Sequence, residues 1–234
     1  MSGHYLSLAS LRRDASTRAM VRALSPSDPD RALDTHHQLV WSLFADDARP
    51  DMPRSFLWRV DGDRFVILSE DAPCDNHSLF DLEVRRLDVL FDEGARFVFR
   101  LRANATVCRT ENVGSTRQQQ RHDVVMDRLR SLQNGNVDLS RSEARERAIP
   151  EAASEWLSRT GERAGFALES LGTTTYRTVD LGRRGKRKAR FGILDTEGVL
   201  TVRQPERFEA AVHEGFGRAK AFGCGLMLLA DRSR

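Results

Sequence analysis

The order of short apolar runs along this sequence restricts the fold more than any other feature. Apolar runs of about four to eight residues bounded by turn signals are typical of strands, whereas apolar positions three or four apart indicate a helix. The clearest signal is a hairpin, in which residues 55–60 and 64–69 flank an Asp-Gly-Asp turn. A strand-like run at residues 5–8 and a helical pattern at residues 31–44 precede it. The chain therefore begins with the order strand, helix, strand, strand.

The rest of the chain continues this alternation with more insertions. Residues 79–91 have a mixed periodicity that predicts a short helix, and a Glu-Gly break at 93–94 follows. Residues 96–104 alternate Phe and Leu with Arg, so one side of this predicted strand is apolar and the other is basic. The later segments predict helices at 121–132, 150–158 (with Pro150 in its first turn) and 205–215, strands at 166–171, 173–181, 191–195, 199–203 and 223–230, and a turn at 196–198.

Two copies of a βαββαβ unit explain this order of elements. We therefore predict an α+β fold with two tandem ferredoxin-like (RRM-like) domains, residues 1–94 and 95–234, and a glycine-rich loop near the C-terminus. The length of 234 residues agrees with one or two domains of roughly 150 residues each. Because 40% of the residues are hydrophobic and 30% are charged, the chain can bury a core, which excludes a disordered protein.

The cysteines and the hydropathy of the sequence indicate where the protein is located and which kinds of site it lacks. The three cysteines, Cys74, Cys108 and Cys224, show neither the CxxC spacing of a zinc site nor the even count of a disulfide framework. No signal peptide is visible, and the longest strongly apolar stretch, near residues 225–230, is far shorter than the ~20 residues of a membrane helix. We expect a reduced cytoplasmic protein without a membrane segment, a metal ion or a small-molecule cofactor.

The densest basic segment spans residues 182–190, where two glycines accompany six cations and no acidic residue. Cations at this density repel one another unless a polyanion is present, and the glycines favour the tip of a hairpin. The segment therefore indicates contact with a nucleic acid, although a solvated surface loop would have the same composition. The cations are Arg183, Arg184, Lys186, Arg187, Lys188 and Arg190.

A second candidate is the glycine-rich segment at residues 214–226, between a predicted helix and the last predicted strand. Its glycines would let backbone amides approach a phosphate, and its two cations would add charge. The spacing matches neither a Walker loop nor a dinucleotide-binding fingerprint. Phosphate binding and a tight structural turn both remain open for this segment. The residues that would bind are Gly215, Gly217, Arg218, Lys220 and Gly223.

The adjacent pair His36-His37 lies on the first predicted helix. Neighbouring helical positions are ~100° apart, so both side chains cannot face one point, and both border the apolar stripe. Without further information, a histidine in such a place packs more often than it catalyses. No metal-ligand spacing, GxSxG motif or partnered cysteine offers another centre in the sequence.

Three segments together resemble the CasE family, the precursor-CRISPR-RNA endoribonucleases of the type I-E Cascade complex. They read HQLVWSLF at 37–44, FRLRAN at 99–104 and GFGRAKAFGCGL at 215–226, and the resemblance spans nearly the whole chain. It implies tandem ferredoxin-like domains of the repeat-associated RNA-binding superfamily and metal-independent cutting at the base of a repeat stem-loop. It also implies that the enzyme stays on its RNA product as a subunit of Cascade, so the expected partners are the CRISPR repeat RNA and the other Cascade subunits.

The resemblance also implies a catalytic histidine on the first helix. The frame His-Gln-x-x-Trp-x-Leu-Phe places it at His37 and leaves His36 as a neighbour. Related enzymes often carry a tyrosine one helical turn earlier, where this chain has Asp34. An aspartate at that position could pair with a protonated imidazole.

Two other classes of function remain open from the residues alone. A noncatalytic RNA-binding subunit of the same superfamily would use His37 only for packing. A DNA-binding regulator would use the basic segment on a duplex.

Overall fold

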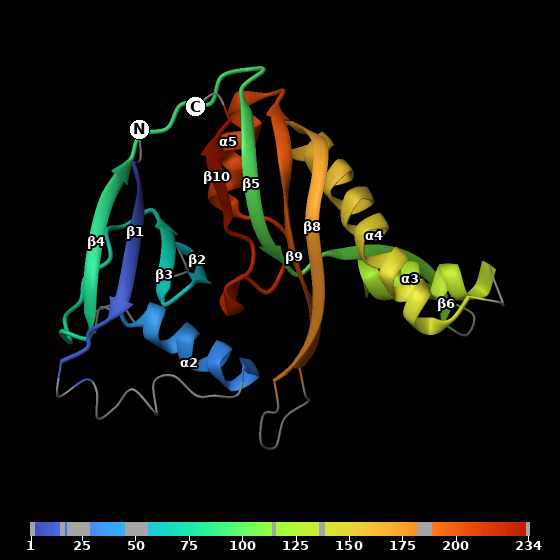
Figure 1. Cartoon of the computed structure of the whole chain (residues 1–234), viewed down its shortest axis with the longest axis horizontal. Helices are drawn as coiled ribbons and strands as arrows, with labels where there is room; N and C mark the ends of the chain where they lie inside the picture. Colours follow the sequence, from blue (N-terminus) through green and yellow to red (C-terminus); the bar gives the residue numbers. More distant parts are fainter. Residues whose placement is uncertain are drawn as a thin grey trace.

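The computed structural model describes residues 3–14, 17, 29–44, 56–113, 116–135, 139–181 and 189–232. Within these residues, the strands form two four-stranded antiparallel sheets and one separate two-stranded ladder. Figure 1 shows the two sheets beside each other, one from each half of the chain.

The first sheet has the order β2-β3-β1-β4. Its hairpin turns at Gly62, whose φ of 66° lies in the left-handed region that glycine adopts readily. The hairpin prediction is confirmed. The helix predicted at 31–44 is also present but spans residues 29–41, and it covers this sheet with Leu39 and Val40, followed by Leu43 of the next turn. The elements are β1 (His4–Leu11), α2 (Pro29–Trp41), β2 (Phe56–Asp61), β3 (Arg64–Ser69) and β4 (Phe80–Leu87).

The second sheet repeats this topology in the order β10-β5-β9-β8. In both sheets the first strand in sequence pairs with the third and the fourth, which is the ferredoxin-like arrangement and confirms the predicted fold class. The elements are β5 (Arg96–Ala103), α4 (Arg141–Ala164), β8 (Phe166–Leu181), β9 (Ala189–Val202), α5 (Pro205–Glu214) and β10 (Met227–Asp231). Because β4 ends at Leu87 and β5 begins at Arg96, we propose residue 94 as the boundary between the two domains.

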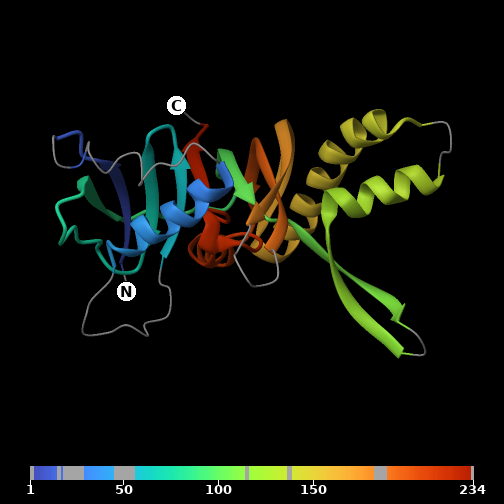
Figure 2. The ribbon, with the colours of Figure 1, turned by 90° about the horizontal axis from the view of Figure 1, so that it is seen from below.

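An insertion separates β5 from α4. It consists of the hairpin β6 (Thr106–Val113) and β7 (Thr116–Asp123), followed by α3 (Val124–Gly135). Figure 2 shows this hairpin and α3 projecting from the side of the second sheet. Leu129 of α3 packs against Ala144 and Ala148 of α4, which attaches the insertion to the domain.

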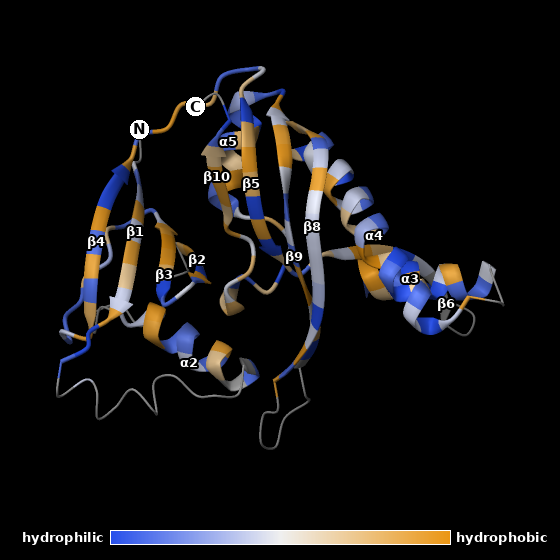
Figure 3. Ribbon diagram, viewed as in Figure 1, coloured by the Kyte–Doolittle hydropathy of each residue, from blue (hydrophilic) through white to orange (hydrophobic). Residues whose placement is uncertain are grey.

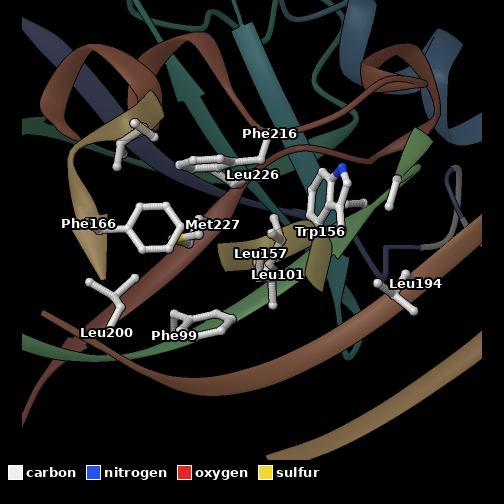
Figure 4. Close-up of a cluster of buried hydrophobic side chains, with 14 of the residues drawn as sticks. Phe99, Leu101, Trp156, Leu157, Phe166, Leu194, Leu200, Phe216, Leu226 and Met227 are labelled. Atoms are coloured by element: carbon white, nitrogen blue, oxygen red, sulfur yellow. The ribbon is translucent and has the colours of Figure 1, made fainter. Parts of the chain in front are cut away.

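The two sheets share one hydrophobic core. Leu57, Val66 and Leu68 of the first sheet belong to the same buried cluster as Phe99 and Leu101 of the second. Figure 4 shows the part of this cluster formed by the second half, and Figure 3 shows hydrophobic residues concentrated in β2 and β3 and alternating with hydrophilic ones along β5. The two halves therefore pack as one body.

The prediction of a helix within residues 79–91 is wrong, because residues 80–87 form β4. This strand lies at the edge of its sheet and is largely exposed. An edge strand with both faces partly in water does not need a strict alternation of apolar and polar residues. The mixed periodicity reflects this position.

The helices of the insertion region also differ from the prediction. Residues 116–123 form β7, so the helix predicted at 121–132 begins at Val124, and Pro150 lies inside the 24-residue helix α4 instead of in its first turn. Helix α4 begins at a capping box of Ser140 and Glu143. Its buried side in this part consists of alanines, which give a weak apolar signal between charged residues.

The turn predicted at 196–198 is absent, because β9 runs unbroken through these residues and pairs with β8, whose register shifts between Leu171 and Thr174. Gly198 lies in mid-strand, where the Ser170 carbonyl and the Phe99 ring leave no space for a Cβ atom. The glycine is there for close packing, which is a common use of glycine within strands.

Candidate functional site

In the structure, the side chains of His36 and His37 contact different sets of residues. The His36 ring makes edge contacts with Trp58 and Phe65, with ring centroids 6.4 and 5.2 Å away, and burial lowers its pKa. Both aromatic residues belong to the buried cluster between α2 and the first sheet, which also contains Leu39 and Val40. The His37 ring lies 6.2 Å from Trp41 and 6.1 Å from Phe222. His37 therefore faces the glycine-rich loop, which comes from the other end of the chain.

Helix α2 also contacts β8 near the end of that strand. Asp30, in the first turn of α2, accepts a hydrogen bond of 2.8 Å from the backbone N–H of Asp180 and lies 3.4 Å from the Arg177 guanidinium. Figure 1 shows α2 extending from the first sheet toward this end of β8. Since β8 and β9 pair as far as Leu181 and Ala189, α2 lies next to the point where the basic segment begins.

The glycine-rich loop connects α5 to β10 and contains the short helix η1 (Lys220–Phe222). Backbone hydrogen bonds attach the loop to the end of β5: Arg218 N–H donates to the Asn104 carbonyl at 3.0 Å, and Gly225 N–H donates to the Arg102 carbonyl at 2.7 Å. The Asn104 side chain is buried and donates to the Gly192 carbonyl at 2.8 Å. The loop thereby has a defined position relative to His37.

Three of the loop glycines are needed for packing. Gly215, Gly217 and Gly223 all have φ between 73° and 83°, and Cβ atoms on them would approach the Leu57 side chain, the Asn104 carbonyl oxygen and the Trp58 ring. These contacts explain glycine at these positions as parts of a structural turn. A role for them in binding phosphate is an additional proposal.

The predicted cations differ in their surroundings. Arg218 is exposed, and its guanidinium makes no ion pair with another described residue, whereas Lys220 donates to the Glu214 carbonyl at 2.7 Å. Arg190 is exposed on β9, opposite Asp180. The other five predicted cations, Arg183, Arg184, Lys186, Arg187 and Lys188, lie outside the described residues.

A small apolar cluster packs between α2, β8, β9 and the glycine-rich loop. Leu33 of α2, Val179 of β8, Ile193 of β9 and Cys224 of the loop are buried together, with Phe222 packed on them. Burial raises the pKa of the Cys224 thiol to about 12, so this cysteine stays protonated and is no nucleophile. The cluster joins four segments that are far apart in the sequence.

Comparison with known proteins identifies the family. The model of the family described as "CRISPR associated protein" matches residues 4–231, which is nearly the whole chain. The chain belongs to this family. The resemblance to the CasE family that the sequence predicts is thereby confirmed.

Individual members of this CRISPR-associated family are similar over most of their length. The Cascade subunit CasE of Escherichia coli (strain K12) is 28% identical over 202 residues, which cover 83% of this chain and 89% of the relative. The crystal structure of Cas6e from E. coli K-12 matches with a TM-score of 0.61 at 22% identity, covering 97% of this chain and 99% of the other. Thermus thermophilus Cse3, bound to an RNA representing a pre-cleavage complex, matches with a TM-score of 0.59 at 19% identity over 97% and 99% of the two chains. These structural matches establish the fold.

Sequence reasoning missed the residues that connect the parts of the site in this CRISPR-associated protein. Asp30 and Phe222 each contact a segment more than 140 residues away, and local patterns carry no signal for such a pair. Asn104 could have been noticed as the polar residue that ends the FRLRAN segment. No group of three or more His, Cys, Asp or Glu that could hold a metal ion occurs among the described residues, and none of their helices is long and apolar enough to cross a membrane.

Proposed function

We propose that this chain is a metal-independent endoribonuclease that cleaves precursor CRISPR RNA at the base of the repeat stem-loop. The observation that carries the proposal is the position of His37, which faces Phe222 of the glycine-rich loop and lies on the helix whose first turn contacts β8. The names of similar proteins support the substrate, since one is a Cascade subunit and another is described as bound to a pre-cleavage RNA.

The chemistry available to one histidine without a metal ion is attack by the 2′-hydroxyl on the adjacent phosphate. A bond forms between the 2′ oxygen and phosphorus, and the bond from phosphorus to the 5′ oxygen breaks. The products are a 2′,3′-cyclic phosphate, or its hydrolysed form, and a 5′-hydroxyl. His37 either accepts the 2′-hydroxyl proton or donates a proton to the leaving 5′ oxygen, a transfer typically worth ~10²–10⁴-fold in rate.

The cations supply the remaining stabilisation by aligning the phosphate and offsetting its developing negative charge. Arg218 is the best placed of the described cations, since its guanidinium is exposed and makes no ion pair with another described residue. Lys220 and the loop glycines would assist from the same loop. The basic segment at 183–190 would hold the RNA stem, whose deep major groove exposes phosphates more readily than base edges.

After cleavage we expect the enzyme to stay on the RNA stem as a Cascade subunit in the cytoplasm. One observation favours the alternative of a noncatalytic RNA-binding subunit. His37 contacts two aromatic rings, and such contacts also suit a residue that only packs.

The experiment that tests the proposal uses a labelled repeat RNA, EDTA, and a matched RNA with 2′-deoxyribose at the scissile nucleotide. The proposal predicts that both RNAs bind and that only the first is cut. Cutting of the deoxy RNA would contradict the 2′-hydroxyl mechanism. Tight binding without any cutting would favour the noncatalytic subunit, and a preference for duplex DNA would favour a regulator.

A further inference from the structure

A pocket of about 650 Å³ reaches the glycine-rich loop, and its lining does not include His37. The hairpin β6–β7, α3 and α4 form its walls, and Gly217 and Arg218 form one end. Figure 2 shows these elements beside the second sheet. The volume is within the range of sites that bind small molecules or single groups of a larger ligand.

The pocket carries an excess of positive charge. Six arginines and three carboxylates line it. Arg109 pairs with Asp127 at 2.7 Å, Arg159 pairs with Glu155, and Arg128 pairs with Glu151, which lies outside the pocket lining. The third lining carboxylate, Glu162, makes no ion pair with another described residue, so it offsets one of the charges that remain. The remaining three arginines, Arg121, Arg163 and Arg218, make no ion pair with another described residue. An anion in the pocket would therefore meet three available guanidinium groups.

An independent observation concerns Thr160, which lines the pocket from α4. The residue is 7% exposed, and its Oγ1 atom has no hydrogen-bond partner among the described residues. A threonine within a helix normally bonds to a backbone carbonyl one turn earlier, and a buried hydroxyl without a partner is unfavourable. A ligand with polar oxygens would supply that partner.

We propose that this pocket binds a nucleotide of the single-stranded RNA that flanks the repeat stem-loop, an inference that rests on the proposed function. Arg121 and Arg163 would contact its phosphate, and Arg218, which the proposed function assigns to the scissile phosphate, lies at the end of the pocket where the strand would enter. RNA is favoured over an acidic peptide because Arg218 belongs to the same loop as Phe222, the neighbour of His37. They are four positions apart, with three residues between them, so their Cα atoms are at most about 14 Å apart. An RNA strand leaving the scissile phosphate reaches the pocket within a few nucleotides.

The test measures the affinity gained from a single-stranded extension. Three RNAs with 2′-deoxyribose at the scissile position are compared: the stem-loop alone, and the stem-loop with a short extension on the 5′ or on the 3′ side. The wild-type protein is expected to bind one extended RNA about tenfold more tightly than the stem-loop alone. That gain disappears in Arg121→Gln with Arg163→Gln and decreases in Thr160→Val. It persists in the control Arg85→Gln, an exposed arginine of β4.

The outcomes separate this inference from the proposed function. Binding is measured with uncleavable RNA, so a failure to cut ordinary repeat RNA contradicts only the endonuclease. No gain from either extension, or a full gain in both pocket variants, would overturn the inference. Polyglutamate binding that the double variant abolishes, with no gain from either extension, would overturn it in favour of an acidic protein partner.

Discussion

His36 and His37 are neighbours on α2, and their rings contact different parts of the molecule. The pKa of His36 is lowered because its ring is withdrawn from water among Trp58 and Phe65. His37 reaches the loop near the C-terminus. Of the two, only His37 is next to the segments expected to bind phosphate, so a difference of one residue decides which imidazole can take part in cleavage.

A substitution at His36 tests this separation. We expect His36→Gln to lower the free energy of unfolding by about 1 kcal/mol, because two aromatic edge contacts are lost. Its cleavage rate at saturating enzyme should stay within about twofold of wild type, since no proton carrier is removed. Urea unfolding and single-turnover cleavage measure the two effects. A loss of cleavage without a loss of stability would show that the roles of the histidines are reversed.

At the scale of elements, the glycine-rich loop needs glycine for two reasons: the backbone has positive φ, and atoms of other segments lie too close for a Cβ atom. Gly217 and Gly62 both have positive φ, but only Gly217 lies against other atoms, since a Cβ there would be 2.8 Å from the Asn104 carbonyl oxygen. The position of the loop beside His37 therefore requires glycine at residue 217.

Alanine substitutions at these two glycines provide a matched comparison. Gly62→Ala should cost about 1–2 kcal/mol for the left-handed conformation alone. Gly217→Ala carries a similar cost and must also displace the loop from Asn104, so we expect a larger loss of stability together with weaker RNA binding. Thermal unfolding and RNA titration measure both. Equal losses of stability in the two variants would mean that the contact with Asn104 is unimportant.

A group of side-chain hydrogen bonds connects three strands of the second sheet. Glu169 of β8 accepts hydrogen bonds from Arg96 of β5, at 2.8 Å from Nε, and from Thr201 of β9. It lies where the pairing of β8 with β9 shifts register between Leu168 and Ser170. These bonds lower the pKa of Glu169 to about 2.

The pKa of Glu169 predicts a pH dependence of stability. A carboxylate whose pKa is lower in the folded state than in the unfolded chain stabilises the folded state. This stabilisation is complete at pH values above 4.5, the ordinary pKa of the group, and is lost as the pH falls toward 2. Glu169→Gln should therefore be less stable than wild type at pH 6, and the difference should shrink between about pH 4.5 and pH 2. Glu93→Gln, at an exposed carboxylate outside the strands, serves as control. A difference that stays constant with pH would contradict the assignment.

The elements differ in how far the sequence could predict them. The hairpin around Gly62, α2 and α5 follow from apolar spacing and turn residues, and the structure confirms them. The strands β6 and β7 are missed because their residues are mostly polar and show no alternation, since the hairpin projects from the body. A strand without a buried face leaves no period in the sequence.

At the scale of the whole molecule, the shared core holds the two sheets together. Arg59 of β2 is 6% exposed and donates to the Arg100 carbonyl of β5 at 3.3 Å, which adds a polar contact between the sheets. This packing brings α2 of the first half to the loop and strand ends of the second. The candidate site therefore belongs to both halves, and neither half alone contains it.

For this reason, much of the site could not be predicted from patterns. The resemblance to a family, not the spacing of residues, selected His37 over His36. The contacts of His37 with Phe222 and of Asp30 with Asp180 depend on how the sheets pack. Composition alone identified the basic segment and the glycine-rich loop as candidates, because charge density and glycine content are local properties.

The distribution of charge over the molecule leads to a prediction about salt. The net charge is only +3, so RNA binding should depend on local clusters of cations. Arg187→Ala with Lys188→Ala should weaken binding and make the plot of log K against log salt shallower by about two, one for each lost phosphate contact. Arg64→Ala with Arg85→Ala, in the first sheet, should leave the slope unchanged. An unaltered slope in the first variant would assign the basic segment to the solvated surface.

The central claim is that His37 carries a proton during cleavage, and the most direct measurement is the single-turnover rate of His37→Ala on repeat RNA in the presence of EDTA. We predict a loss of ~10²–10⁴-fold in that rate, with an affinity for the uncleavable stem-loop close to that of wild type. Cutting by His37→Ala at the wild-type rate, with EDTA present, would contradict the account.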